Sequence, residues 1–533
     1  MKKLVALLIA AAMVLTMSMS VFATVPTSQT IKDDSAADAD GKYTISVGSS
    51  DTHTYTVYQI LTGTLVAGEN KLGNPAWGAD AKGGTADVNA FITSITASGL
   101  SNVQINDLVK AQLKEGASGQ GTVDKDNSLD VLPGYYLIVD TTDPLADKDA
   151  KSLNIVAVFN DIELAPKKGT TESEKHVDDQ NDSDSADHSE LKDSADYDIG
   201  DKIPYTLTMT LPEDYANYKQ YKVVFTDDMS KGLTYNGDAK IFYGANDTSG
   251  DAVTFTAGGT SSYEGGTVYT YTIANLKAED ATDEQKALQA GSVIKITYTA
   301  TLNKDAVIGE AGNPNKYKVD FSSNPNQDAG GTPETNDTPW DTNIVFTYKT
   351  VFNKVDSNKQ PLTGADFELY KFVEAENGVD EYGEKKGTWT KVTDLGSGDN
   401  KPSKATENAG EGDTAAKNTK FTFSGIEEGV YKLVETVTPT GYNTLEDQIF
   451  TITAEHELES DNPTLTSLTG TDGAQFTMTA DKAAGSLTAD IENRQGSELP
   501  STGGMGTTIF YIVGAILVIG AGVVLVTRRR MEA

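Results

Sequence analysis

The chain has 533 residues and a formal charge of −35, from 43 Lys and Arg against 78 Asp and Glu. At about 150 residues per domain, this length allows three or four domains. So acidic a surface repels phosphate and excludes nucleic acid as a partner. Cysteine is absent and only four histidines occur, which excludes disulfides and thiolate chemistry and leaves few options for histidine catalysis or zinc.

The N-terminus has the features of a secretory signal peptide. Two lysines follow Met1, an apolar stretch covers 4–15, and the small residues Val21 and Ala23 occupy the −3 and −1 positions of a cleavage site. The alternative is a membrane anchor, which the shortness of the apolar stretch disfavours. We therefore predict residues 1–23 to be removed on secretion.

Patterns typical of β-strands dominate the mature chain. Apolar and polar residues alternate over 203–211 and again over 294–302, and clusters of Gly, Asn and Asp separate such runs. The convincing helical stretch is 88–113, which Gly99 interrupts. These patterns predict an all-β protein of tandem immunoglobulin-like β-sandwich domains, with a little helix in the N-terminal domain.

Two polar junctions rich in Pro, Gly and Thr, at 165–171 and 330–342, divide the chain. They predict domains at 24–165, 170–348 and 349–495.

Two polar segments interrupt the strand pattern. Residues 178–190 carry six acids and no Lys or Arg, a composition typical of a calcium-binding loop. They lack the Gly and the ligand spacing of an EF-hand, so a solvated acidic loop is favoured and no metal is predicted. Residues 374–417 are polar and Gly-rich and predict a long surface insertion.

Three residues of the last domain could react with one another. Alternation places Lys354 on the core face of the first strand, Glu435 on the core face of a late strand, and Asn493 at the end of the last strand. An apolar site drives a lysine and a carboxylic acid towards their neutral forms. A neutral amine could attack the Asn carboxamide with the acid moving protons, giving an isopeptide bond and ammonia without a cofactor. The alternative is a buried Lys354–Glu435 salt bridge.

The C-terminus combines three features in a fixed order. The pentapeptide Leu499-Pro500-Ser501-Thr502-Gly503 precedes a hydrophobic run at 509–526, long enough to cross a bilayer, and then Arg528–Arg530. Without the pentapeptide this would be a tail anchor. With it, segment 499–533 resembles the cell-wall sorting signal of Gram-positive surface proteins. The resemblance implies that a sortase cleaves between Thr502 and Gly503.

The stretch 431–442 resembles the E-box of Gram-positive pilins, and the whole last domain resembles a collagen-adhesin B-type domain of a shaft pilin. The resemblance implies that Lys354 and Asn493 are joined and that Glu435 promotes the reaction. The sequence departs from the family mainly at Thr438, where Ala is common.

The second domain resembles the A-type pilin domain in two stretches, 225–234 and 321–326. The resemblance implies a bond between Lys175 and Asn324, promoted by Asp227. Asn315 is the alternative partner, because Ser323 stands where the family may place its reacting Asn. The plain alternative is a solvated lysine beside an ordinary turn.

The junction 162–168 resembles the pilin motif, which supplies the acceptor amine for polymerisation. By position Lys167 is the acceptor and Lys168 the second choice, although Ala165 replaces the family's Tyr. An exposed basic linker is the alternative.

Together these resemblances imply the shaft subunit of a sortase-assembled pilus, anchored in the cell wall at the outer surface and supporting adhesion. The implied partners are pilin-type and housekeeping sortases, identical subunits joined head to tail, accessory pilins, peptidoglycan, and a host glycan or matrix ligand. The chain is predicted not to be an enzyme beyond its own autocatalytic cross-linking, and to need no cofactor. The alternatives are a monomeric wall-anchored adhesin and an accessory pilin.

Overall fold

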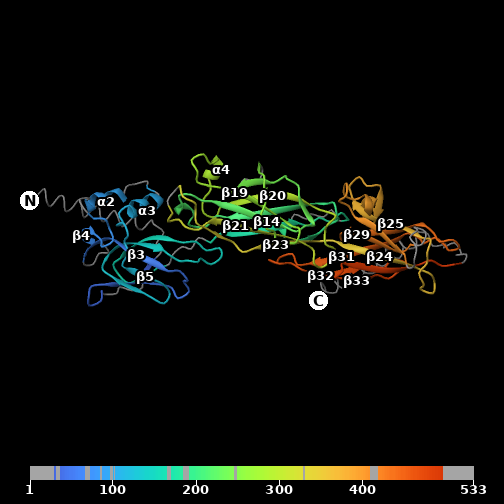
Figure 1. Ribbon diagram of the computed structural model, residues 1–533, viewed down its shortest axis with the longest axis horizontal. Coiled ribbons are helices and arrows are strands. Elements are labelled where there is room, and N and C mark those ends of the chain that lie inside the picture. Colours follow the sequence, from blue (N-terminus) through green and yellow to red (C-terminus); the bar gives the residue numbers. More distant parts are fainter. Residues whose placement is uncertain are drawn as a thin grey trace, which may run out of the picture.

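A computed structural model of the chain describes residues 29–31, 37–66, 72–83, 87–95, 100, 102–164, 170–183, 191–244, 249–327, 330–408 and 418–495. Its described strands form six sheets, arranged as three successive sandwiches along the long axis of the molecule (Figure 1). We call them the N-terminal, middle and C-terminal sandwiches. They confirm the predicted all-β class with tandem sandwiches. The domain limits stay a prediction.

Within this described part of the chain, no helix is long and apolar enough to cross a membrane. The predicted signal peptide at 1–23 and the segment 499–533 lie outside the described residues.

The N-terminal sandwich consists of one sheet in the order β1-β9-β2-β6 and a second in the order β4-β3-β7-β8, with β5 also paired to β3. Its strands are β1 (Gln29–Ile31), β2 (Tyr43–Val47), β3 (Tyr55–Leu65), β4 (Leu72–Trp77), β5 (Gly121–Val123), β6 (Leu129–Val131), β7 (Gly134–Asp140), β8 (Leu153–Val158) and β9 (Ile162–Leu164). The predicted helical stretch is confirmed as α2 (Val88–Ile95) and α3 (Asn102–Lys110). Gly99 itself lies outside the described residues.

Strand β7 is buried along nearly its whole length, because its sheet is covered on both faces. One face packs against the other sheet through Tyr136 and Ile138. The opposite face packs against α2 and α3 through Tyr135 and Leu137. This double cover explains why the sequence here is a continuous apolar run and does not alternate.

The middle sandwich pairs the sheet β11-β10-β13-β20-β16-β17 with the sheet β12-β23-β21-β14-β19-β18; β15 also pairs with β20, and β22 with β21. Its elements are β10 (Glu172–Asp178), β11 (Leu191–Lys192), β12 (Ser194–Asp196), β13 (Lys202–Thr210), η1 (Tyr215–Asn217), β14 (Val223–Met229), β15 (Leu233–Tyr235), β16 (Lys240–Tyr243), β17 (Asp251–Ala252), β18 (Thr256–Ala257), β19 (Thr267–Ile273), α4 (Asp283–Lys286), β20 (Val293–Leu302), β21 (Asn313–Ser322), β22 (Thr335–Asp337) and β23 (Asp341–Phe346). Every second residue of β13, β20 and β21 is buried, as the alternation predicts.

The C-terminal sandwich pairs the sheet β28-β29-β24-β34-β33 with the sheet β26-β27-β25-β30-β31-β32. Its elements are β24 (Tyr348–Val355), β25 (Asp366–Glu374), β26 (Asp380–Tyr382), β27 (Lys385–Lys391), η2 (Val392–Asp394), β28 (Ser403–Asn408), β29 (Asn418–Ile426), β30 (Gly429–Val437), β31 (Gln448–His456), β32 (Leu465–Gly470), β33 (Thr479–Asp481) and β34 (Ser486–Glu492). The first and last strands, β24 and β34, lie side by side and parallel.

The described part of the predicted insertion, 374–408, is more ordered than the sequence predicts. Its strands β26 and β27 extend one sheet and β28 extends the other. The order has a packing cause, because the Trp389 ring lies 5.4 Å from the Phe372 ring in an edge-on contact.

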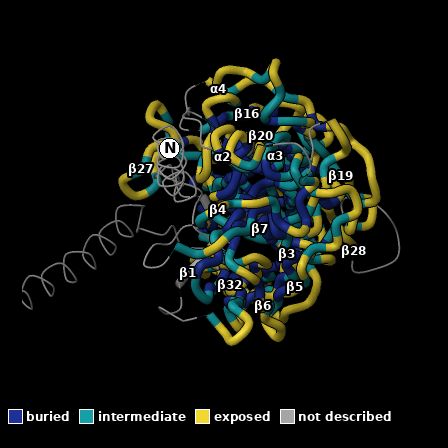
Figure 2. The backbone as a smooth tube through the Cα atoms, turned by 90° about the vertical axis from the view of Figure 1, so that its left-hand side faces the viewer, coloured by how far each residue is buried: buried dark blue, intermediate teal, exposed yellow. Residues whose placement is uncertain are grey.

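Viewed from its N-terminal end, the molecule shows buried strands surrounded by exposed loops (Figure 2). Polar contacts link successive sandwiches. Between the N-terminal and middle sandwiches, Lys219 forms an ion pair of 2.5 Å with Asp107 of α3. Between the middle and C-terminal sandwiches, Lys371 on β25 is fully buried and lies 2.6 Å from Asp198 Oδ2.

Candidate cross-linking sites

In the C-terminal sandwich the fold brings Lys354, Glu435 and Asn493 into one buried site. Parallel pairing of β24 with β34 sets Lys354 opposite Ile491, two residues before Asn493. Glu435 reaches the site from β30 in the facing sheet. The three residues are 1%, 7% and 2% exposed, so all three lie in the core, as the alternation predicts for Lys354 and Glu435.

The acid in this site holds the amide. Asn493 Nδ2 donates to Glu435 Oε1 at 2.7 Å and to Oε2 at 3.0 Å, and the backbone N–H of Leu445 donates to Oε2 at 2.7 Å. The Asn493 Oδ1 atom is buried and finds no hydrogen-bond partner among the described residues. Glu435 is therefore placed beside the nitrogen that would leave as ammonia.

The lysine in this site is held by carbonyl groups. Lys354 Nζ donates to the backbone oxygens of Val355 and Ile491, each at 2.9 Å. Burial lowers the pKa of Lys354 to about 8, although the negative charge of Glu435 opposes the shift. The amine donates to neutral carbonyls and makes no ion pair with Glu435, which disfavours the salt-bridge alternative.

In the middle sandwich, Lys175 extends from β10 across the core to the facing sheet. Its Nζ lies 2.9 Å from Asp227 Oδ1 and donates to the Tyr298 hydroxyl at 2.8 Å. The ring of Tyr205 lies 4.7 Å from the same nitrogen. Burial lowers the pKa of Lys175, against the opposing charge of Asp227. A solvated lysine is therefore the wrong description of this residue, which is fully buried.

Asn315 is the asparagine that completes this group. Its Nδ2 donates to the Tyr298 hydroxyl at 2.9 Å, and its Oδ1 is buried without a partner among the described residues. The register explains its position: β21 pairs with β14 so that Asn315 lies opposite Met229, two residues along from Asp227. Asn315 and Asp227 thus share one face of neighbouring strands.

The structure does not place Asn324 in this group. Asn324 lies beyond the end of β21, where its Oδ1 accepts the backbone N–H of Asn326. Asn326 in turn donates to the carbonyl of Ser152, so this loop packs on the N-terminal sandwich. Nine residues of chain separate Asn324 from Asn315, too far along an extended strand for Lys175 to reach both. Of the two asparagines that the sequence leaves open, the geometry therefore favours the alternative, Asn315, over Asn324.

Tyr298 is the residue that sequence reasoning missed. The alternation identifies it as inward-facing on β20, yet nothing in the pattern gives its hydroxyl a role. Its hydroxyl joins the lysine and the asparagine, and it stacks on Tyr205 with ring centres 5.2 Å apart.

The residues predicted to link subunits cannot be placed. Lys167 and Lys168 fall in 165–169, and Thr502 and Gly503 fall in 496–533, all outside the described residues.

Three family models match the chain. One, described as the Cna-B-like domain of Gram-positive pilin backbone subunit 2, matches residues 199–325 in the middle sandwich. A prealbumin-like fold domain, SpaA, matches 349–464, and an LPXTG cell wall anchor motif matches 492–533. Together these matches support a Gram-positive, LPXTG-anchored backbone pilin. The matched pilin families are structural, which supports a protein that is not an enzyme, and the anchor motif indicates a cell-wall-anchored pilin at the outer surface.

A curated relative of this pilin is the trypsin-resistant surface T6 protein of Streptococcus pyogenes serotype M6. It is 27% identical over 401 residues, which are 62% of this pilin and 65% of the relative. This pilin thus spans just under two thirds of that relative's length.

The chain is also similar to solved pilin structures. The T6 backbone pilin of the same serotype is 17% identical with a TM-score of 0.45, and the match covers 88% of this pilin and all of that chain. The major pilin SpaD of Corynebacterium diphtheriae is 18% identical with a TM-score of 0.40, over 86% and 98% of the two chains.

Proposed function

We propose that this pilin is the structural shaft subunit of a covalent pilus, strengthened by an internal Lys–Asn bond in each of its last two sandwiches. The observation that carries the proposal is chemical. Two buried lysines, each with a lowered pKa, lie in sites that also hold a buried acid and an asparagine.

The reaction in the C-terminal sandwich joins Lys354 Nζ to Cγ of Asn493. The Cγ–Nδ2 bond breaks, and Glu435 carries a proton from the amine to the departing nitrogen, which leaves as ammonia. In the middle sandwich Lys175 joins Asn315 in the same way, with Asp227 as the acid. The folded core supplies the proximity that free amides lack.

Each internal bond closes a loop of about 140 residues, from Lys354 to Asn493 or from Lys175 to Asn315. By analogy with the chain-entropy estimate for disulfides, each would stabilise the pilin by about 5 kcal/mol. In a chain without cysteine, such bonds take the place of disulfides.

The proposal extends to links between subunits. A sortase would cleave between Thr502 and Gly503 and pass the Thr502 carbonyl to the Lys167 amine of the next subunit. A head-to-tail contact of this kind does not close on itself and so builds a fibre. The housekeeping sortase would join the last subunit to peptidoglycan, and accessory pilins and a host ligand would complete the adhesive fibre.

Co-expression with a pilin-type sortase tests the shaft role. The parent chain should give a ladder of covalent multimers on a denaturing gel, and Lys167→Arg should abolish it while Lys168→Arg, the matched control, should leave it. A ladder that persists when both lysines are replaced would contradict polymerisation through this junction and favour a monomeric adhesin.

A further inference from the structure

Two clusters of acidic side chains lie where the middle and C-terminal sandwiches meet. The first contains Asp182, Asp198 and Asp201, whose carboxylates converge. A lysine neutralises it: Lys371 Nζ lies 2.6 Å from Asp198 and 3.3 Å from Asp182, and it also contacts Glu427. This cluster already contains its cation.

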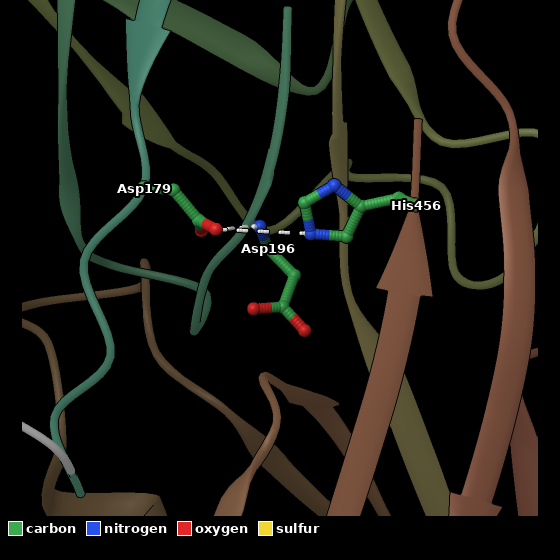
Figure 3. A group of neighbouring side chains, drawn as sticks. All are labelled: Asp179, Asp196 and His456. Carbon is green, nitrogen blue, oxygen red and sulfur yellow. Dashed lines mark hydrogen bonds and ion pairs between the residues drawn. The ribbon is translucent and has the colours of Figure 1, made fainter. Parts of the chain in front are cut away.

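The second cluster contains a histidine. Asp179 follows β10, Asp196 ends β12, and His456 ends β31, so the middle sandwich supplies two carboxylates and the C-terminal sandwich an imidazole (Figure 3). One ligand atom from each lies within 4.8 Å of the other two. His456 Nε2 is 3.8 Å from Asp179 Oδ2, too far for a hydrogen bond. Lys192 Nζ is 3.7 Å from the same Asp179 oxygen, a longer contact than the one that Lys371 makes with Asp198 in the first cluster.

The hydrogen bonds of Ser194 direct a lone pair of His456 towards these carboxylates. The Ser194 hydroxyl donates to the carbonyl of Glu457, so its oxygen is free to accept from His456 Nδ1 at 2.7 Å. A neutral imidazole with its proton on Nδ1 has its lone pair on Nε2. An outer partner that orients the other ring nitrogen is the usual arrangement for a metal-binding histidine.

A buried hydroxyl gives a second, independent indication. Tyr348 on β24 is fully buried, and its hydroxyl faces Asp196 without forming a hydrogen bond of normal geometry to any described residue. The Asp196 backbone N–H donates to Asp179 Oδ1 at 3.2 Å, which ties the two acids together. The group thus contains a lone pair and an unsatisfied hydroxyl facing carboxylates, which a bound cation would satisfy.

We propose that Asp179, Asp196 and His456 bind one divalent transition-metal cation, which joins the middle and C-terminal sandwiches. One imidazole and two carboxylates favour zinc over calcium, because calcium prefers oxygen ligands alone. Zinc ligands sit about 2.0–2.2 Å from the metal, so the side chains need to move inward by only about 1 Å. The three residues are distant from one another in the sequence, so no spacing motif predicts the site.

Zinc titration of the full-length protein, purified in detergent and freed of metal by a chelator, tests the site. We expect one tightly bound equivalent and a higher temperature of unfolding. His456→Gln and Asp196→Asn should each weaken binding at least tenfold, and Ser194→Ala about tenfold. His176→Gln, which replaces a histidine of the middle sandwich outside the group, should bind as the parent does.

Cobalt as a spectroscopic probe separates ligation from simple ion pairing. The parent should give visible absorption bands of a low-coordinate cobalt site, and His456→Gln and Asp179→Asn should lose them while keeping the parent's circular dichroism. Absence of tight zinc binding, or zinc affinity that His456→Gln leaves unchanged, would overturn the proposal. Calcium binding as tight as zinc binding would also overturn it, because the imidazole would then not be a ligand.

Discussion

The two lysine sites reach the same combination of groups by different means. In the C-terminal sandwich the acid holds the asparagine, and the lysine is held by two backbone carbonyls. In the middle sandwich the acid holds the lysine, and a tyrosine hydroxyl connects the lysine to the asparagine. The comparison teaches that the acid can begin next to either reactant, provided that burial keeps the amine close to neutrality and all the groups together.

The two proposed bonds also protect different lengths of chain from unfolding under load. In the C-terminal sandwich Lys354 is on the first strand and Asn493 directly follows the last, so the proposed bond spans the whole sandwich. In the middle sandwich Asn315 lies on β21, and β22 and β23 come after it. Load between Lys167 and Thr502 would cross both sandwiches but would bypass the N-terminal one.

Pulling single molecules by Lys167 and Thr502 should give the largest difference between the parent and a variant. The parent should release only the middle-sandwich segment 316–347, about 30 residues or roughly 100 Å of chain. Asn493→Ala should add an extension of roughly 450 Å, because the C-terminal sandwich can then unzip. An Asn493→Ala protein that extends no further than the parent would contradict the covalent account of this sandwich.

Replacing each asparagine of the middle sandwich sharpens the comparison. Asn315→Ala should remove the bond to Lys175 and cost about 5 kcal/mol in the free energy of unfolding. Asn324→Ala is the matched control and should leave the bond intact. Intact mass and denaturant unfolding report both effects. If Asn324→Ala removes the bond and Asn315→Ala does not, the partner of Lys175 is Asn324, which the sequence resemblance favours.

The N-terminal sandwich contains a buried cation that cannot become an amide. His53, which is 1% exposed, bonds to Asp140 at 2.6 Å and to Asp149 at 2.7 Å. Burial alone would lower the pKa of His53, but the two carboxylates outweigh it and raise the pKa to about 9. This ionic cluster ties the start of β3 to the end of β7 and the loop that follows.

The stabilisation that the His53 cluster provides should depend on pH, unlike that of the covalent sites. Because the folded pKa is above the unfolded value of about 6.5, the contribution is complete below pH 6.5 and is lost as the pH rises through about 9. His53→Gln should destabilise the N-terminal sandwich by about 2 kcal/mol at pH 6 and by much less at pH 10. Unfolding curves at the two pH values check this, and an equal loss at both would show that the charge is irrelevant.

The smallest expected effect is kinetic. Tyr298→Phe removes the hydroxyl between Lys175 and Asn315 and should slow that bond about tenfold through poorer positioning, without affecting the final stability. The intact mass, followed over time after cell-free synthesis, measures the rate, and the C-terminal bond in the same molecule serves as an internal control. Equal rates for parent and variant would mean that Tyr298 has no part in positioning the reactants.

The sequence identified the three residues that meet in the core of the C-terminal sandwich, because the acid belongs to a specific motif and the lysine and asparagine mark the first and last strands. For the middle sandwich it named Lys175 and Asp227 but gave Asn315 only as the alternative to Asn324, since the motif resemblance pointed past the end of β21. The burial of Tyr317, Val319 and Phe321 at every second position shows that alternation alone puts Asn315 on the inner face. Contacts between sandwiches, such as those of Lys371 and His456, depend on how two domains meet, and no local pattern records that.

The most direct test of the central claim is the intact mass of the mature chain with peptide mapping. We predict a mass lower than that of the translated residues by two molecules of ammonia, with cross-linked peptides joining Lys354 to Asn493 and Lys175 to Asn315. Glu435→Ala should restore one ammonia and leave the middle bond unchanged. A parent protein with the full translated mass would contradict the account.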